Sequence, residues 1–272
     1  MKKVFLTIAI VLITIFTLSA CTGGGPTVDQ SWASNETLTY SMYDSLVNNG
    51  TTKVGSVSIV TTTNLTQEEK DKVSKADTKV IIEINKDNVC SIKTTYYTRV
   101  QNVLSLTREY DDLVDDNNDY TLSARHDDKN YVYDLTYTDT AKNKSGKINV
   151  GSSNYTDNEF LYFYIRCYDA ESVPSSIKIA DPFNDTSYEL SCSYTSGAET
   201  IATETELGSV ICNEITINRA ESPVGTGIVA YYLPEKDEYK YGDYALIKSV
   251  KFPTKIVENN VSYVLNGFSA SK

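Results

Sequence analysis

The sequence predicts a mainly β protein, and three observations support that fold class. Apolar and polar residues alternate along most of the chain from Glu36 onward, which is typical of strands with one buried face. Thr, Tyr, Val and Ile dominate these runs, as pleated, half-buried surfaces prefer. Hydrophobic residues make up 40% of the 272, including 21 Tyr, which is enough for a packed core. No fixed period recurs, which argues against a propeller or a solenoid.

The first 20 residues have the parts of an export signal. Met1-Lys2-Lys3 is a short basic region, an apolar run covers residues 4–18, and the segment ends in Leu18-Ser19-Ala20-Cys21. The cysteine after Leu-Ser-Ala resembles a bacterial lipobox. That resemblance implies that Cys21 is diacylated on its sulfur, becomes the mature N-terminus and holds the protein to a membrane. An ordinary secretory signal is the alternative.

The predicted organisation has three parts. Residues 1–20 form the lipoprotein signal peptide, and residues 21–31, rich in glycine and poor in apolar residues, form the lipidated cysteine and a flexible tether. Residues 32–272 contain no Pro- or Gly-rich linker, so we expect a single β-rich extracytoplasmic domain. The expected location is the bacterial cell envelope, lipid-anchored and facing outside the cytoplasm.

The first hairpin is the clearest local signal. Residues 38–42 and 57–59 alternate on either side of Asn49-Gly50, a pair that accepts the positive φ angles of a tight turn. Further strands are predicted over residues 80–84, 89–100, 103–110, 120–124, 131–137, 177–180, 188–194, 210–218, 228–233, 244–252 and 262–265.

Two short helices are expected beside the strands. Thr66 and Glu69 have capping-box spacing, but few apolar residues follow, which predicts a short solvated helix. Thr156 and Glu159 have the same spacing and precede a strongly apolar segment. That segment fits either a buried helix or a strand, and we favour a helix. Its apolar residues are the candidate ligand-binding residues: Phe160, Leu161, Phe163 and Ile165.

Charge and motifs exclude several functions. The chain carries 25 basic and 36 acidic residues, so nucleic acid is not an expected partner. The single histidine, His126, is expected in a polar turn without identifiable catalytic or zinc partners. Asp115-x-Asn117-x-Asp119 resembles the start of an EF-hand loop, but Tyr120 stands where glycine is needed and His126 where glutamate is needed. We therefore predict no catalytic residue, no metal and no cofactor.

Four cysteines besides Cys21 could form disulfides in an exported protein. They are Cys90, Cys167, Cys192 and Cys212. Strand alternation predicts that Cys192 faces inward and Cys212 outward, which would prevent that pair from bonding. We favour free, mostly buried thiols.

Two stretches resemble a family of exported bacterial β proteins. They are residues 38–59, the opening hairpin, and residues 157–268, which contain Leu161-Tyr162-Phe163-Tyr164-x-Arg166 and later Tyr231-Tyr232-Leu233-Pro234. The family is uncharacterised and is similar to the LolA-type open half-barrel. The resemblance implies a single curved antiparallel sheet or open half-barrel with one or two short helices. It also implies that the protein binds something apolar or scaffolds envelope components.

The sequence therefore favours a non-catalytic, membrane-anchored binding or carrier domain. Its partners would be the membrane, through the lipid on Cys21, and an apolar ligand or an envelope protein. The apolar residues 160–165 would plug the concave face, although the same residues could equally be ordinary core. A surface adhesion or glycan-binding module is the alternative, because Tyr rings stack on sugars. An enzyme ranks third.

Replacement of the candidate lipidation residue tests the anchoring prediction. We expect Cys21→Ser to abolish incorporation of a labelled fatty acid, because serine lacks the thiol that is acylated. Undiminished labelling of Cys21→Ser would show that the lipid, if any, is attached elsewhere.

Overall fold

The computed structural model describes residues 35–99, 102–127, 129–151, 155–157, 161, 174–219, 228–232 and 253–271. Most of these residues belong to strands of one fifteen-stranded sheet. The predicted fold class, mainly β with a single curved antiparallel sheet, is confirmed. Within the described ranges, no helix combines the length and the apolar character that a membrane crossing requires.

The strands follow one another in two meanders. The strands are β1 (Asn35–Asp44), β2 (Lys53–Thr62), β3 (Thr78–Lys86), β4 (Cys90–Arg99), β5 (Asn102–Asp112), β6 (Tyr120–Asp127), β7 (Asn130–Tyr137), β8 (Lys144–Asn149), β9 (Tyr155–Thr156), β10 (Ser176–Asp181), β11 (Thr186–Ala202), β12 (Ser209–Arg219), β13 (Ile228–Tyr232), β14 (Pro253–Glu258) and β15 (Val261–Ser271). The helical elements are α2 (Gln67–Lys72) and three 3₁₀ turns, η1 (Asn48–Gly50), η2 (Asp116–Asn118) and η3 (Thr140–Lys142).

The first and last strands of the chain, β1 and β15, lie side by side in the middle of the sheet. β1 pairs with β2 on one side and with β15 on the other, so the hydrogen-bonded order runs from β8 back to β1 and then from β15 back to β9. Among the described strands, every pairing is antiparallel except that of β9 with β10, which is parallel. The two meanders therefore depend on one long-range strand pair to become a single sheet.

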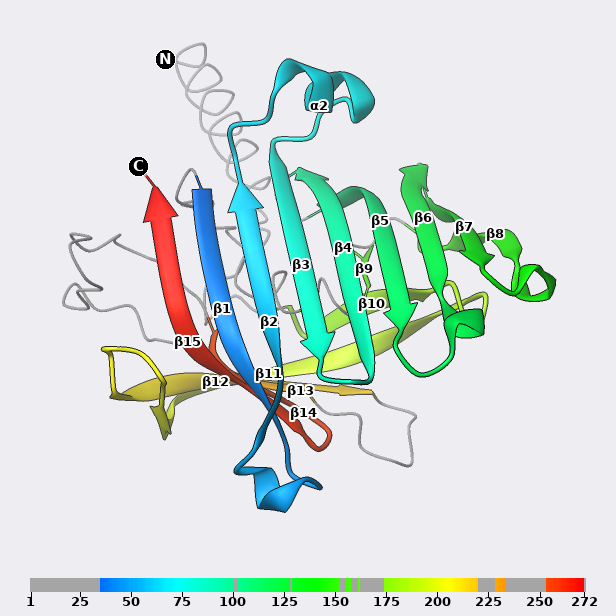
Figure 1. Cartoon of the computed structure of the whole chain (residues 1–272). Coiled ribbons are helices and arrows are strands. Elements are labelled where there is room, and N and C mark those ends of the chain that lie inside the picture. The colour runs from blue at the N-terminus through cyan, green and yellow to red at the C-terminus, as the bar shows by residue number, and fades with distance from the viewer. Residues whose placement is uncertain are drawn as a thin grey trace, which may run out of the picture.

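The sheet curves until its two halves face each other. Register shifts interrupt β1 on both sides, after Thr39 against β15 and after Met42 against β2, and another follows Tyr97 in β4. Such bulges bend a strand and increase its twist. In Figure 1 the strands β1–β5 stand upright, and β11–β13 run across behind them at a steep angle.

The core lies between these two layers. Residues Leu38, Tyr40 and Met42 of β1 point into it, as their alternation predicts, and they belong to one buried cluster that spans both meanders. The largest fully buried side chains are Tyr40, Tyr96, Tyr131, Tyr133, Leu38, Ile82, Leu122, Leu135 and Leu161. Many tyrosines therefore pack inward rather than standing on the surface.

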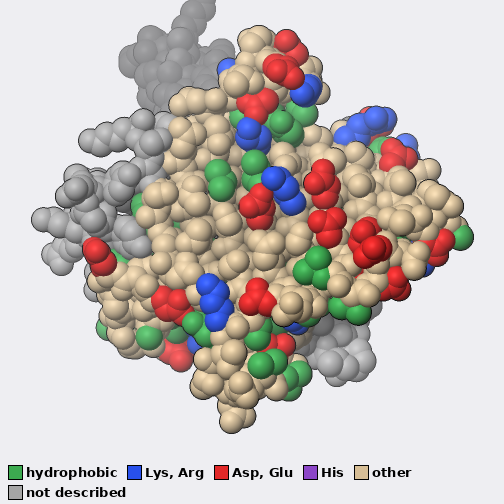
Figure 2. Space-filling view, in the orientation of Figure 1, with side chains coloured by type: hydrophobic (Ala, Val, Ile, Leu, Met, Phe, Trp, Pro, Cys, Tyr) green, Lys and Arg blue, Asp and Glu red, His purple; other side chains and the backbone are tan. Residues whose placement is uncertain are grey.

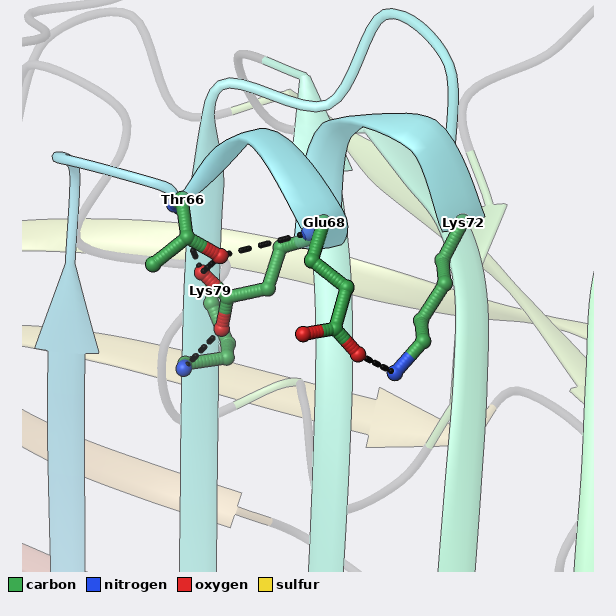
Figure 3. Close-up of polar contacts among 5 residues, drawn as sticks. Thr66, Glu68, Lys72 and Lys79 are labelled. Carbon is green, nitrogen blue, oxygen red and sulfur yellow. Dashed lines mark hydrogen bonds and ion pairs between the residues drawn. The ribbon is translucent and has the colours of Figure 1, made fainter.

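The predicted first hairpin and the predicted capping box are both confirmed, although residues 45–52, which include η1, join the two strands in place of the expected tight turn. Asn49 and Gly50 adopt positive φ angles of 55° and 73° between β1 and β2. Thr66 Oγ1 accepts a hydrogen bond from the Glu69 backbone N–H at 3.3 Å, and Glu69 Oε2 accepts one from the Thr66 N–H at 2.8 Å. The helix that follows, α2, buries no side chain, as predicted (Figure 3).

Glu69 also ties α2 to the sheet. Its Oε1 forms an ion pair with Lys79 of β3, while the neighbouring Glu68 pairs only with Lys72 on the same helix (Figure 3). The Lys79 ammonium, with the Thr66 backbone N–H, lowers the pKa of Glu69 from its ordinary value to about 2.

Glu69→Gln tests this link through its pH dependence. Because the folded-state pKa is lowered, the charged carboxylate stabilises the fold at pH values above its ordinary pKa, and this contribution is lost as the pH falls towards 2. We therefore expect Glu69→Gln to be less stable than wild type at neutral pH, with the difference shrinking below pH 4.5 in urea unfolding. Glu68→Gln is the matched control, and since its side chain is 79% exposed we expect little change. Equal effects of the two substitutions would contradict this assignment.

Strands β8, β9 and β14 were not predicted. The other strands match the predicted runs in place, although β11 and β15 are longer than predicted. The predicted strand over residues 244–252 lies outside the described residues, as do residues 1–34 with Cys21 and the proposed tether.

Candidate functional site

The seam between the two sheet edges is the most distinctive place in the structure. β8 and β9 stand at opposite ends of the hydrogen-bonded order, and no ladder joins them among the described residues. Instead, side chains reach across. Lys144 of β8 hydrogen-bonds the carbonyl oxygen of Phe183 and lies 3.4 Å from Asp185, both in the turn between β10 and β11. The Phe183 ring also meets the Tyr120 ring edge-on, with centroids 5.3 Å apart.

A buried ion pair makes the most enclosed link between the two halves. Arg108 of β5 places Nη2 3.0 Å from Oδ2 of Asp157, the residue after β9. The two side chains are only 3% and 4% exposed. Tyr96 donates its hydroxyl to Asp157 Oδ1 at 2.7 Å and accepts from Arg108 Nη2 at 3.2 Å. Thr94 accepts from Arg108 Nε at 3.0 Å. We call these four residues the Arg108 network.

Strands β4 and β5 hold the other three residues of this network, of which Tyr96 and Arg108 contact Asp157 and Thr94 contacts Arg108. Thr94 and Tyr96 alternate along β4, and the register pairs Thr94 with Arg108 of β5. Arg108 shares the inward face of its strand with Leu106, so the alternation turns a long cationic side chain into the core. A buried charge is costly unless it is paired and hydrogen-bonded, and Asp157 supplies that partner.

A cluster of aromatic rings lies near the same seam. Tyr110 and Tyr120 stack with centroids 4.9 Å apart and planes 7° from parallel, and Tyr137 packs on Tyr120 at 5.4 Å. Burial, followed by nearby Cys90, raises the pKa of Tyr110 to about 12. With Phe183, these rings form the aromatic cluster.

The same strands carry an open depression of about 380 Å³. It is lined by Glu109, Tyr110, Asp111, Asp119, Tyr120, Thr121, Thr136, Tyr137 and Thr138. Figure 2 shows acidic side chains gathered on the side of the molecule where Figure 1 places β5 and β6.

The acidic loop that follows β5 is held by its own carboxylates. Asp112 accepts hydrogen bonds from the backbone N–H groups of Val114 and Asp115, and Asp119 accepts one from the N–H of Asp112. The EF-hand geometry is not formed, because Tyr120 and His126 are strand residues of β6. No group of metal-ligating side chains occurs among the described residues.

The structure describes only part of the predicted ligand-binding segment. Leu161 is fully buried in the core cluster. Phe160, Phe163 and Ile165 lie outside the described residues, and so does Cys21. Thr156, the expected cap of that helix, belongs to β9, and the next residue, Asp157, contacts Arg108.

His126 and Cys212 correct two sequence predictions. His126 lies in β6 and is half-buried, rather than in a polar turn, because that strand extends further than its apolar residues indicate. Cys212 is fully buried, whereas the sequence predicted that it faces outward. The register between β11 and β12 shifts between Thr195 and Glu199. Because alternation does not continue across such an irregularity, it gave the wrong face for Cys212.

The described thiols are free. Cys90, Cys192 and Cys212 form no disulfide. The register places Cys192 opposite Ile217, five residues along β12 from Cys212, so that roughly 17 Å separates them at a rise of about 3.4 Å per residue. Burial raises the pKa of all three thiols, that of Cys192 to about 12, which leaves them poorly reactive at neutral pH. Cys167 lies outside the described residues.

The fold is similar to that of a solved protein whose function is also unknown. The crystal structure is of a beta-barrel-like protein of the domain of unknown function DUF1849 from Brucella abortus. The match has a TM-score of 0.50 and 10% sequence identity, and it covers 88% of this chain and 99% of that one. At this identity the likeness concerns the fold alone. No protein-family model matches the sequence, and no curated protein matches it either.

Sequence reasoning missed the Arg108 network. The sequence did indicate that Arg108 faces inward, because it alternates with Leu106 and Tyr110 on the same side of the predicted strand. Asp157 gave no comparable signal, since it stands in a segment that has the pattern of a helix start.

The contribution of the ion pair can be measured by a double-mutant cycle. We expect Asp157→Ala to lower the free energy of unfolding by about 3–5 kcal/mol, because it leaves the Arg108 charge buried without its partner. Arg108→Met combined with Asp157→Ala should lose less than the sum of the losses that Arg108→Met and Asp157→Ala cause singly. Additive effects in urea unfolding would contradict direct coupling.

Proposed function

We propose that this protein is a membrane-anchored, extracytoplasmic and non-catalytic domain that binds an apolar ligand or an envelope partner. The anchor would be the lipid on Cys21, and the binding region would be the concave face between the two meanders.

The observation that carries the proposal is a seam closed by side chains. Lys144 of the end strand β8 contacts Phe183 and Asp185 in the turn between β10 and β11, and Arg108 contacts Asp157 deeper inside. Side-chain contacts can separate without breaking a strand ladder, so the interior can be reached while the sheet stays intact. A fully hydrogen-bonded barrel would offer no such route.

The interior behind this seam suits an apolar guest. Leu106, Leu122 and Leu135 lie on it among inward-facing tyrosines, and in the closed form they are nearly inaccessible to solvent. Binding there requires the layers to move apart, which favours a protein that alternates between a filled and an open state.

A glycan-binding module is the second candidate, and the aromatic cluster favours it. Tyr110, Tyr120 and Tyr137 lie beside carboxylates and threonines in the open depression, and sugars bind through such combinations of stacking and hydrogen bonds. This candidate ranks lower because the largest buried tyrosines pack into the core.

Native mass spectrometry tests the proposal. The chain from Thr22 onward, which lacks both the signal peptide and the acylated cysteine, would be purified gently from a bacterial host without detergent. We expect a bound species with the mass of a lipid that disappears when the protein is denatured. A clean ligand-free mass would count against the carrier function. Calorimetric binding of soluble oligosaccharides that is lost in Tyr120→Ala would then support the glycan-binding module.

A further inference from the structure

In the described part of the chain, most of the exposed large apolar side chains gather at one end of the meander β1–β8. Because neighbouring strands of this meander are antiparallel, the turns after β1, β3 and β5 lie at the same end, which is the lower end in Figure 1. Seven large apolar side chains are exposed among the described residues, and these turns carry five of them: Leu46, Val47, Val89, Leu113 and Val114. Apolar side chains that gather on a surface commonly mark a binding site.

The loop between β5 and β6 presents two of these side chains in a row. Leu113 is 60% exposed and Val114 is 76% exposed. Val89 lies beside them, because its carbonyl oxygen accepts a hydrogen bond from the Leu113 N–H at 2.9 Å. We call Val89, Leu113 and Val114 the apolar tip.

Hydrogen bonds hold the apolar tip in place. Asp112 Oδ1 accepts from the Val114 N–H at 2.9 Å, and Asp112 Oδ2 accepts from the Asn118 side-chain amide at 3.0 Å. These bonds, first that from Val114, lower the pKa of Asp112 and keep it charged. Lys142, in the turn after β7, donates to Asn118 Oδ1 at 3.1 Å. The loop therefore presents its apolar side chains in a fixed conformation, and a preorganised surface loses little entropy on binding.

Carboxylates flank the apolar tip on both sides. The loop reads Asp111-Asp112-Leu113-Val114-Asp115-Asp116, and residues 109–124 contain no Lys or Arg. Within the described part of the chain, none of these four carboxylates forms an ion pair. Their negative charge is therefore left for a basic partner.

The open depression adjoins the same loop. Asp111 and Asp119 line it, together with Glu109 of β5. Its volume of about 380 Å³ admits the end of a Lys or Arg side chain. The loop thus offers an apolar contact and, next to it, an acidic recess.

We infer that the apolar tip and the acidic depression form a docking surface for a protein segment that carries apolar side chains flanked by Lys or Arg. The apolar tip would pack against the apolar side chains, and the carboxylates would meet the basic ones. A bilayer fits this surface less well, because anionic lipids repel its carboxylates. A second copy is disfavoured for the same reason, since a two-fold contact brings the same acidic loop to both sides. The surface lies outside the concave interior, so this inference goes beyond the proposed function.

Binding of defined peptides tests the inference. The chain from Thr22 onward, which contains every described residue, would be titrated calorimetrically with a helical peptide of Leu and Lys whose leucines form one face. Two further probes replace either every Lys by Glu or every Leu by Ala. We expect the Leu/Lys peptide to bind at least tenfold more tightly than either, because it alone matches both the apolar tip and the carboxylates.

Matched variants locate the binding surface. Leu113→Ser combined with Val114→Ser should weaken binding of the Leu/Lys peptide at least tenfold. Ile211→Ser removes an apolar side chain of β12 that is 55% exposed, and it should leave the affinity unchanged. Asp111→Asn combined with Asp116→Asn should weaken binding as well and reduce its dependence on salt. Urea unfolding checks that each variant is folded.

Several outcomes would overturn the inference. Equal binding of the three peptides, or equal affinity of the parent and the Leu113→Ser/Val114→Ser variant, would show that the apolar tip is not the contact. Flotation with phosphatidylethanolamine–phosphatidylglycerol vesicles that this variant loses would assign the tip to a lipid surface. Dimerisation in sedimentation velocity that this variant loses would assign it to a second copy. The native mass of the parent chain decides the proposed function separately in each case.

Discussion

In the described part of the chain, no backbone ladder joins the end strands β8 and β9, and side-chain contacts link the two halves of the sheet instead. The most buried of these contacts is the ion pair between Arg108 and Asp157. It joins a strand in the interior of the front meander to a residue that follows the shortest strand of the back meander. Hydrophobic packing brings the two layers together, but it is not directional, whereas this pair fixes which part of the second layer lies over β4 and β5.

The remaining architecture supports that contact. The pairing of β1 with β15 makes one sheet from two meanders, and bulges on both sides of β1 give it the curvature that brings Arg108 and Asp157 within reach. Lys144, Phe183 and Asp185 add a second, more exposed link further along the seam. The exposed and the buried links have different consequences. Exposed contacts contribute little stability and exchange readily, while opening the buried pair requires another partner for Arg108.

Features that depend on neighbouring residues could be predicted from the sequence, whereas features that depend on contacts between distant residues were missed. The Asn49-Gly50 turn, the Thr66 capping box and the alternation in β1 to β7 depend on neighbouring residues, so they could be found from the sequence. β8 was missed because Lys144–Asn149 contains one large apolar residue and a glycine, and that strand exists because it pairs with β7. The inward face of Cys212 depends on a register shift that alternation does not reveal. The Arg108 network joins residues 49 positions apart, and nothing in the sequence selects Asp157 from 36 acidic residues.

Hydrogen exchange in the Arg108→Met variant tests most directly whether this ion pair closes the sheet. The account predicts faster amide exchange in β9, β10 and the turn that contains Phe183, with unchanged protection of β1, β2 and β15. Equal acceleration across β1, β2 and β15 would contradict it, because the pair would then support the whole fold rather than the seam. Unchanged exchange in β9 and β10 would contradict it as well, because closure would not depend on Arg108.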